Sequence, residues 1–340
     1  MPPSNQIPMG KLPADLLRDL LERYATSDPR VVVGPRVGED VAIIDMGDRY
    51  LVAKTDPVTF ATDEIGWYAV HVNANDVACS GATPRWFLAT VLLPQTGTTP
   101  ELAETIFKQI ADACRQLGVS LCGGHTEITY DLRRPIVVGQ MLGEVAPDGY
   151  VTTSGAQPGD ALILTKGIAV EGTAIIAREK HDELRGVLPD AALGRCADFL
   201  HVPGISVVRD ARLALEVGGV HALHDPTEGG VATGLWELAR SAEVGLVIDE
   251  PRLPLLPECV TLCRHFGLDP LGLIGSGALL IAAAKDRAAA IVGRLGEEGI
   301  ASAEIGEVVP ARQGCCLRSA DRSLRPLPTF SRDEITRLFE

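Results

Sequence analysis

The segment H-V-N-A-N-D-V-A-C-S-G-A-T-P, residues 71–84, determines how the rest of the sequence is interpreted. Residues 65–80 are predicted to form a helix, and the segment places Asn73, Asn75 and Asp76 among alanine, valine and cysteine. Asn and Asp lower helix propensity in the middle of a helix. If the helix is buried, each of these polar side chains must find a hydrogen-bond partner or bind a ligand. An internal hydrogen-bond network is the alternative to a binding site.

Acidic residues stand at the ends of two predicted strands that precede this helix. The strands cover residues 41–46 and 50–55, and Asp40 stands directly before the first while Asp56 follows the second. Carboxylates at the mouths of neighbouring strands can converge on one hard cation, and Mg²⁺ takes one or two carboxylates together with substrate phosphates. Asp76 is the candidate third carboxylate. A single Asp at a strand end is more often a turn or cap residue, so the hypothesis of a metal site depends on all three.

The segment C-G-G-H-T-E, residues 122–127, follows an apolar run and combines a flexible backbone with titratable side chains. Gly123 and Gly124 are interpreted as a turn whose backbone approaches a ligand closely, as phosphate-binding turns do. His125 and Glu127 stand beside that turn. Because imidazole titrates near neutral pH, His125 is the best candidate for proton transfer. A structural histidine is the alternative interpretation.

Two glycine-containing turns follow predicted strands in the second half of the chain. They are G-I-A-V-E-G-T-A at 167–174 and H-D-P-T-E-G-G-V-A at 224–232. A glycine turn between a strand and a helix directs backbone N–H groups and the helix dipole at a phosphate, although neither turn is a Walker A loop. Ordinary helix caps are the alternative, with Thr227 as the predicted N-cap. The candidate phosphate-binding residues are Gly167, Gly172, Asp225, Thr227, Gly229 and Gly230.

The organisation of the chain predicts a layered α/β or α+β protein. An amphipathic helix is predicted over residues 12–24, and strands alternate with helices of moderate length through the rest of the sequence. The stretch from 146 to 160 is rich in Gly, Pro, Ser and Thr and is the candidate boundary between domains. We therefore expect a first domain over residues 1–150, a second over 151–320 and a polar tail over 321–340.

Composition narrows the classes of function. The chain has 340 residues, 46% of them hydrophobic, and a formal net charge of −14. Such an acidic surface repels phosphate backbones, so nucleic acid is not the expected partner. No secretory signal and no uninterrupted apolar span are visible, so we expect a soluble, cytoplasmic protein without membrane contact. The eight cysteines form no C-x-x-C motif, and only the vicinal pair Cys315–Cys316 is a candidate for reactivity.

Taken together and in this order, seven segments resemble the aminoimidazole-ribonucleotide (AIR) synthetase, or PurM, superfamily, and within it the hydrogenase-maturation dehydratases of the HypE type. The resemblance covers about residues 10–310, and N-D-V-A-x-x-G-A-x-P together with D-P-T-x-G-G is specific to this group. The segments are G-E-D-V-A-I (38–43), T-D-P (55–57), V-N-A-N-D-V-A-C-S-G-A-T-P (72–84), G-G-H-T-E (123–127), P-G-D-A-L-I (158–163), H-D-P-T-E-G-G-V-A (224–232) and G-S-G-A-L-L (275–280).

The resemblance implies a PurM-like fold in which the first domain pairs with its twin, so that two half-sheets close a barrel across a homodimer. The second domain would be a sheet covered by helices, and ATP would lie in the cleft between domains. Asp40, Asp56 and Asp76 would hold the phosphates through Mg²⁺. The implied reaction is ATP-dependent activation of an amide- or thioamide-type oxygen, or phosphoryl transfer, on a small or carrier-bound substrate. The remaining nucleotide-binding candidates are Gly38, Asn73, Asn75, Gly123, Gly124 and the residues of the two glycine turns.

Three positions depart from the HypE pattern. HypE ends in a cysteine that receives a carbamoyl group, whereas this chain ends T-R-L-F-E at 336–340, so the HypE reaction on its own tail is not expected. Where HypE has G-D-T, this chain has His125 between Gly124 and Thr126, with Glu127 as a compensating acid. Glu228 replaces the arginine of D-P-T-R-G-G and reverses a charge beside the second glycine turn.

Two further readings stay open beside that of a Mg-ATP-dependent enzyme. The first is a nucleotide-binding scaffold without catalysis that docks to a maturation partner, which the missing tail cysteine and Glu228 favour. The second is a small-molecule kinase resembling thiamine-monophosphate kinase, which the three aspartates favour and His125 disfavours. A selenophosphate synthetase fits less well, because no cysteine precedes Cys79.

Overall fold

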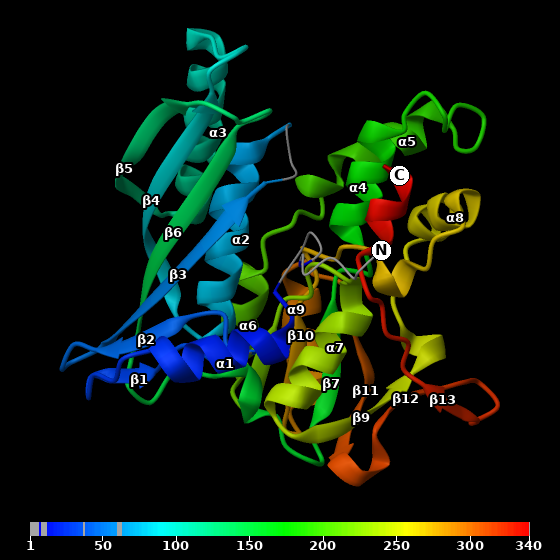
Figure 1. The fold of residues 1–340 in the computed structure, drawn as a ribbon. Coiled ribbons are helices and arrows are strands. Elements are labelled where there is room, and N and C mark those ends of the chain that lie inside the picture. The colour runs from blue at the N-terminus through cyan, green and yellow to red at the C-terminus, as the bar shows by residue number, and fades with distance from the viewer. Residues whose placement is uncertain (1–6, 8–11, 37, 60–62, 340) are drawn as a thin grey trace, which may run out of the picture.

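A computed structural model shows a mixed α/β protein built on two sheets that lie side by side (Figure 1), which confirms the predicted fold class. It describes residues 7, 12–36, 38–59 and 63–339. The first sheet has the strand order β1-β2-β3-β6-β4-β5. Its elements are α1 (Ala14–Tyr24), β1 (Val31–Val33), β2 (Ala42–Asp45), β3 (Tyr50–Val58), α2 (Ile65–Cys79), β4 (Thr83–Pro94), α3 (Pro100–Leu117), β5 (Ser120–Thr129) and β6 (Ile136–Val145).

The second sheet has the strand order β13-β12-β9-β11-β7-β10-β8. Its strands are β7 (Ala161–Thr165), β8 (Val220–His224), β9 (Val244–Asp249), β10 (Leu280–Ala283), β11 (Ser302–Pro310), β12 (Cys315–Arg318) and β13 (Leu324–Pro326). Its helices are α4 (Val170–Glu179), α5 (Asp190–Ala197), α6 (Val208–Val217), α7 (Gly230–Ser241), α8 (Pro257–Phe266) and α9 (Ala288–Glu297). Strands β11 to β13 and helix α8 are not among the elements that the sequence predicts.

Helix α3 shows how local sequence sets the limits of an element. Thr99 accepts the Leu102 N–H at 3.2 Å, Pro100 occupies the first turn, and Gly118 ends the helix in the left-handed conformation. Each of these residues is favoured at its position. The helix therefore covers Pro100–Leu117, which confirms the predicted range.

One face of the first sheet is packed and the other is open. On β4 the side chains of Phe87, Ala89, Val91 and Leu93 are buried, because every second residue points toward helices α2 and α3. Helix α2 is buried on nearly all sides, since Ala78 and Cys79 also pack into the core of the second sheet. This position explains why α2 carries apolar residues all round.

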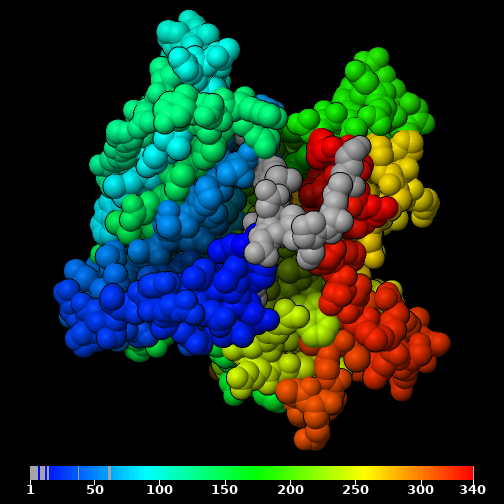
Figure 2. Space-filling model, in the orientation of Figure 1, coloured from blue at the N-terminus to red at the C-terminus, as the bar shows by residue number. Residues whose placement is uncertain are grey.

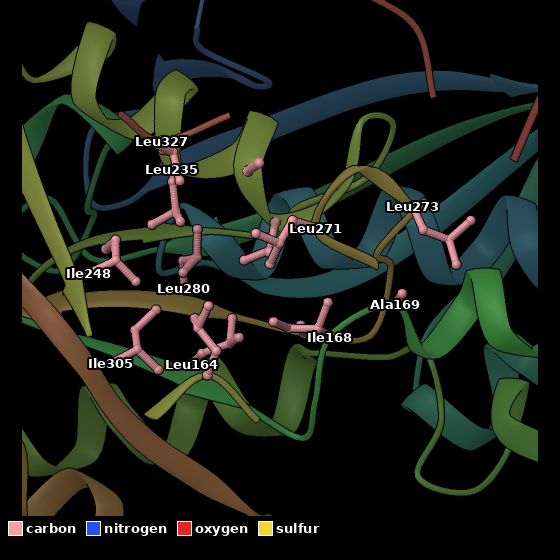
Figure 3. Close-up of a cluster of buried hydrophobic side chains, with 14 of the residues drawn as sticks. Leu164, Ile168, Ala169, Leu235, Ile248, Leu271, Leu273, Leu280, Ile305 and Leu327 are labelled. Carbon is pink, nitrogen blue, oxygen red and sulfur yellow. The ribbon is translucent and has the colours of Figure 1, made fainter. Parts of the chain in front are cut away.

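The second sheet is covered on both faces. Leu162 and Leu164 of β7 face one core, and Ala161 and Ile163 face the other. Figure 3 shows part of the larger core, where Leu164 and Ile305 lie on strands and Leu235 reaches in from α7. Leu327 lies in the same core, so the C-terminal residues 324–338 are part of the second sheet and its cover.

The described helices contain no segment that is both long and apolar enough to cross a membrane.

Candidate functional site

A lysine holds two of the predicted metal ligands. The Lys54 Nζ atom lies 2.6 Å from Asp76 Oδ2 and 3.3 Å from Asp56 Oδ2. Lys54 and Asp56 are two residues apart on β3, so both side chains point to the face over which α2 passes. The structure thus brings Asp56 and Asp76 together as predicted. Lys54 was not among the predicted site residues, although residues two apart on a strand share a face, so its spacing from Asp56 could have indicated it.

Burial and neighbouring charge act in opposite directions on these groups. Burial lowers the pKa of Lys54, but the carboxylates of Asp76, Asp56 and Asp40 outweigh it, and the pKa is raised overall. Burial and the nearby charge of Asp225 raise the pKa of Asp76 well above its ordinary value, against the lowering effect of Lys54. The lysine is therefore a permanent cation in a cluster of carboxylates.

Asp225 joins this cluster from the second sheet. It follows β8, and its Oδ1 accepts a hydrogen bond from Cys79 Sγ of α2 at 3.4 Å. Its Oδ2 is buried and has no hydrogen-bond partner, and burial raises the pKa of Asp225 to about 6. A buried carboxylate oxygen without a partner is the atom that a bound cation or protonated group would satisfy.

Asp40 lies at the same meeting point of the two sheets. Its Oδ2 is 4.0 Å from His224 Nδ1, and His224 Nε2 is 2.9 Å from Glu237 Oε2 of α7. Desolvation lowers the pKa of His224, but Glu237, Asp40 and Asp225 outweigh it, and the pKa is raised overall. Neither His224 nor Glu237 was a candidate in the sequence analysis, because nothing in their spacing links them.

The donor chemistry of this cluster suits Mg²⁺. Carboxylates are the ligands that the ion prefers. The buried Asp225 Oδ2 has no hydrogen-bond partner, so a cation nearby would stabilise it. In the described part of the chain, however, no three His, Cys, Asp or Glu side chains are arranged so that all could hold one ion. An ion here would therefore depend on phosphate oxygens and water for most of its shell, as is usual for Mg²⁺ in nucleotide sites.

Gly38 packs against helix α7. It has φ +92°, and a Cβ atom there would lie 2.3 Å from Ser241 Oγ, whose hydroxyl donates to the Gly38 carbonyl. The glycine is explained by this close approach.

The two asparagines of α2 have partners within the protein. Asn73 Nδ2 donates to the Ala69 carbonyl at 2.8 Å. Asn75 Nδ2 donates to the Ile205 carbonyl, and its Oδ1 accepts the Val207 N–H, both at 2.8 Å. The amide of Asn75 thus ties α2 to the segment that leads into α6. For Asn75 the prediction of a ligand contact was wrong, and the alternative of an internal network is correct.

The predicted turn at Gly123 and Gly124 was also wrong, because both residues lie inside strand β5. A Cβ atom at Gly124 would lie 2.0 Å from the Ala89 carbonyl oxygen, so the glycine permits close pairing with β4. The apolar run before it continues as strand instead of ending in a turn.

His125 and Glu127 do not reach the acidic cluster of their own chain. Strand β5 is separated from β3 by β6 and β4, which places the two strands about 14 Å apart. The residues in register across these four strands are Asp56, Gly139, Ala89 and Gly124. Because Gly124 shares the face of Asp56, the next side chain, His125, points to the opposite face. The His125 and Glu127 side chains are exposed, with Nε2 and Oε2 3.4 Å apart, on the outer strand of the sheet (Figure 1).

In the second glycine turn, the backbone N–H groups are hydrogen-bonded to other groups of the chain. The Gly229 N–H donates to Asp333 Oδ2 at 2.6 Å, and the Gly230 N–H donates to the Thr227 carbonyl at 3.0 Å. Both predicted phosphate-binding amides are therefore already bonded. Gly229 is the N-cap residue of α7 and Thr227 is not, so that prediction was wrong as well.

The first glycine turn serves packing. Gly172 lies within α4, its N–H donates to the Ile274 carbonyl at 3.1 Å, and a Cβ atom there would lie 2.5 Å from Leu273. A Cβ atom at Gly167 would meet Leu256 at 3.0 Å. Packing against neighbouring leucines is thus sufficient to explain both glycines, and phosphate binding at this turn stays a prediction.

Glu171 is a titratable residue that the sequence analysis left out of the candidates. It lies in the first turn of α4 and is 5% exposed. Its Oε2 has no hydrogen-bond partner, and burial raises the pKa of Glu171 to about 7. A glutamate that titrates near neutral pH can donate or accept a proton in a reaction.

Figure 2 shows a notch in the molecular surface between the first sheet with its helices, on the left, and α5 with the C-terminal residues, on the right. The C-terminal segment that carries Asp333 lies on the second-sheet side of this notch (Figure 1).

Comparison with known proteins gives two family-model matches. Residues 38–145 match the model described as AIR synthase related protein, N-terminal domain. Residues 157–314 match the model described as AIR synthase related protein, C-terminal domain.

Among curated relatives, the chain is similar to carbamoyl dehydratase HypE from Cupriavidus necator, with 31% identity over 314 residues that cover 89% of this chain and 86% of the relative. It is also similar to the selenide, water dikinase of Nitratidesulfovibrio vulgaris, with 32% identity over 272 residues, 76% of this chain and 72% of the relative.

Among solved structures, the chain resembles hydrogenase maturation protein HypE in complex with ATP, with 26% identity, a TM-score of 0.72, and coverage of 97% of this chain and 98% of the other. Thiamine monophosphate kinase from Aquifex aeolicus, at 18% identity, shares the fold alone, with a TM-score of 0.69 and coverage of 92% and 98%.

Proposed function

Because this chain belongs to the AIR synthase related protein family, we propose that it is a Mg²⁺-ATP-dependent enzyme that activates an amide- or thioamide-type oxygen of a small or carrier-bound substrate by phosphorylation. The observation that carries the proposal is the meeting of Lys54, Asp56 and Asp76 with Asp225. These residues come from two sheets and three separate motifs, and they form one charged cluster.

The residues of the cluster have distinct tasks in this proposal. Asp40, Asp56 and Asp76 would hold Mg²⁺ partly through water, with phosphate oxygens completing its shell, and the ion when bound neutralises charge on the phosphates. Lys54 holds Asp76 in place through its 2.6 Å contact and opposes the rise that burial causes in the pKa of Asp76, and its fixed charge favours the approach of a triphosphate.

Phosphorylation would serve a clear chemical purpose. An amide oxygen is a poor leaving group, and transfer of a phosphoryl group to it makes its later loss easy. The oxygen attacks phosphorus, the bond between that phosphorus and the nucleotide breaks, and the proton released from the substrate goes to a base. Lys54 and the cation that the aspartates would hold would stabilise the negative charge that develops on the transferred group.

We further propose that β5 pairs with a second copy of the chain. Every residue from Ser120 to Ile128 on this strand is exposed, including Leu121 at 41% and Ile128 at 61%. An exposed edge strand with apolar side chains is a template for pairing with another chain. In a homodimer closed along β5, His125 and Glu127 would lie at the interface, where His125 could act only on the partner's substrate.

Two alternatives are each favoured by one observation. Transfer of phosphate to a metabolite, as in a small-molecule kinase, would use the same three aspartates. A nucleotide-binding scaffold for a maturation partner is favoured by the closed glycine turn, in which Asp333 takes the amide that a phosphate would need.

Calorimetric titration of ATP, with and without Mg²⁺, tests the proposal. We expect binding that requires Mg²⁺ in the native chain and is weakened at least tenfold in Asp76→Asn. Glu179→Gln, at the far end of α4, serves as the control and should bind as the native chain does. Equal binding by Asp76→Asn would contradict the proposed metal site. Binding without transfer of labelled γ-phosphate to any amide or metabolite would favour the scaffold.

A further inference from the structure

A small cavity lies where His224 faces Asp40. Its volume is ≈ 10 Å³, and its walls include Asp40, Asp76, Cys79 and His224. A cavity of this size has room for one water molecule or one ion. The cavity therefore offers a place for a single cation between the two sheets.

The protonation of His224 follows from its partners. Its Nε2 lies 2.9 Å from Glu237 Oε2, and a carboxylate can only accept a hydrogen bond, so Nε2 carries the proton. Glu237 thereby fixes the ring orientation, as the outer carboxylate of a metal-bound histidine does. The other nitrogen, Nδ1, is directed at Asp40.

The distance between His224 and Asp40 suits a shared ion better than a hydrogen bond. His224 Nδ1 and Asp40 Oδ2 are 4.0 Å apart, which is too long for a direct hydrogen bond. It is about twice the 2.0–2.1 Å at which a nitrogen or oxygen ligand binds a small divalent ion. An ion held by both atoms would therefore need little change in their separation.

We propose that His224 is a nitrogen ligand, opposite Asp40, of a divalent cation in this cavity, and that the site favours Mn²⁺ over Mg²⁺. Mn²⁺ shares the preference of Mg²⁺ for oxygen ligands but, as a first-row transition metal, accepts an imidazole nitrogen more readily than Mg²⁺ does. The proposal rests on the proposed nucleotide site, because phosphate oxygens and water must supply the remaining ligands where no third protein side chain is in position.

The surrounding residues agree with this choice of ion. Asp76 is engaged by Lys54 and Glu39 by Arg36, so two of the three carboxylates that line the cavity already face a cation and Asp40 is the third. The Cys79 thiol donates to Asp225, so its sulfur keeps its proton and is not a thiolate ligand of the kind that zinc and copper favour. Asp225 does not line the cavity, but its charge is near enough to Asp40 for the two carboxylates to interact.

Pulsed EPR of bound Mn²⁺ tests the assignment directly. Mn²⁺ is added to the full chain alone and together with a non-hydrolysable ATP analogue, and the ¹⁴N modulation of a coordinated imidazole is recorded. We expect this modulation in the native chain and its loss in His224→Gln. Competition by Mg²⁺ should show Mn²⁺ affinity falling about tenfold in His224→Gln, with Mg²⁺ affinity changing less than threefold.

Two further variants separate coordination from general damage. Glu237→Gln leaves the cavity wall intact and should weaken Mn²⁺ binding by about tenfold, since loss of an outer carboxylate has effects of that size. His221→Gln, on the same strand and paired with Asp160 at 2.8 Å, should keep the nitrogen signal. Nitrogen modulation that survives in His224→Gln, or Mn²⁺ bound by the native chain without any modulation, would overturn the assignment.

These experiments test the role of His224 separately from the proposed nucleotide site. Mg²⁺-dependent ATP binding without a nitrogen signal from Mn²⁺ would refute His224 as a ligand and leave the nucleotide site standing. No Mn²⁺ binding with or without the analogue would refute the cation cavity itself.

Discussion

The cluster around Lys54 and the turn at Gly229 both carry sequence patterns for phosphate chemistry, yet the fold treats them differently. In the cluster, one lysine faces two aspartates and a buried carboxylate oxygen is left unpartnered. In the turn, a carboxylate from the C-terminal segment already occupies the backbone amide. The comparison shows that a sequence motif typical of phosphate binding can bind a ligand only where its polar groups are not already bonded to another part of the chain.

Removing the lysine should break the cluster and give the largest loss of stability. Lys54→Met leaves Asp76 buried without its cation, which costs about 3–5 kcal/mol in the free energy of unfolding. Urea unfolding at pH 7 measures it. Lys108→Met is the matched control, because that lysine pairs with Asp112 at the same 2.6 Å but in solvent, where a pair contributes about 0–1 kcal/mol. Equal losses in the two variants would contradict a buried charge cluster.

The pH dependence of stability should reveal Glu171, the buried acid on the second-sheet side whose Oε2 has no hydrogen-bond partner. With a pKa of about 7 in the folded chain against 4.5 in the unfolded one, the native state keeps a proton that the unfolded state has lost. The free energy of unfolding should therefore fall as pH rises from about 4.5 to 7, by about 3 kcal/mol at most. Glu171→Gln should flatten this part of the pH profile. An unchanged slope in the variant would show that another group titrates there.

Opening the glycine turn should have a moderate effect. Asp333→Ala removes the acceptors of the Gly229 and Ile274 N–H groups, and an unmet buried donor costs about 1–3 kcal/mol. Thermal and urea unfolding measure the loss. Asp321→Ala is the control, since that exposed aspartate bonds only to its neighbour Ser323 and should change stability by about 0.5 kcal/mol or less. A loss in Asp333→Ala no larger than in the control would mean that the turn is not held closed.

The smallest effect on folding is expected at β5, which belongs neither to the cluster around Lys54 nor to the turn at Gly229. Ile128→Lys places a charge on an exposed side chain, so the stability of the single chain should change by about 0.5 kcal/mol or less. A dimer that pairs along β5 should nevertheless dissociate, as light scattering coupled to gel filtration would show. Asp131→Lys, just beyond the strand, is the charge control. A dimer that survives Ile128→Lys would place the interface elsewhere.

Much of the fold could be predicted because its signals are local. The caps of α3 are adjacent in sequence to the helix that they limit, and the apolar pattern of β7 and β8 marks buried strands. Strand β5 could not be predicted, because Gly123 and Gly124 are typical of turns and their use here depends on how closely the Ala89 backbone approaches. Strands β11 and β12 pair with β7 and β9, which lie far away in the sequence, and the short strand β13 pairs only with β12 among the described strands. No local pattern marks these three strands.

The sequence by itself determined the family, the mixed α/β fold and the grouping of Asp56 with Asp76, since these follow from motifs and from side chains that alternate along strands and helices. Only the tertiary structure decided which polar groups remain available. Asn75 is used by Ile205 and Val207, 130 and 132 residues away, and Gly229 by Asp333, 104 residues away. The physical reason is that most buried donors and acceptors bond to a partner that the folded chain brings near, and packing across the whole molecule sets which groups find one.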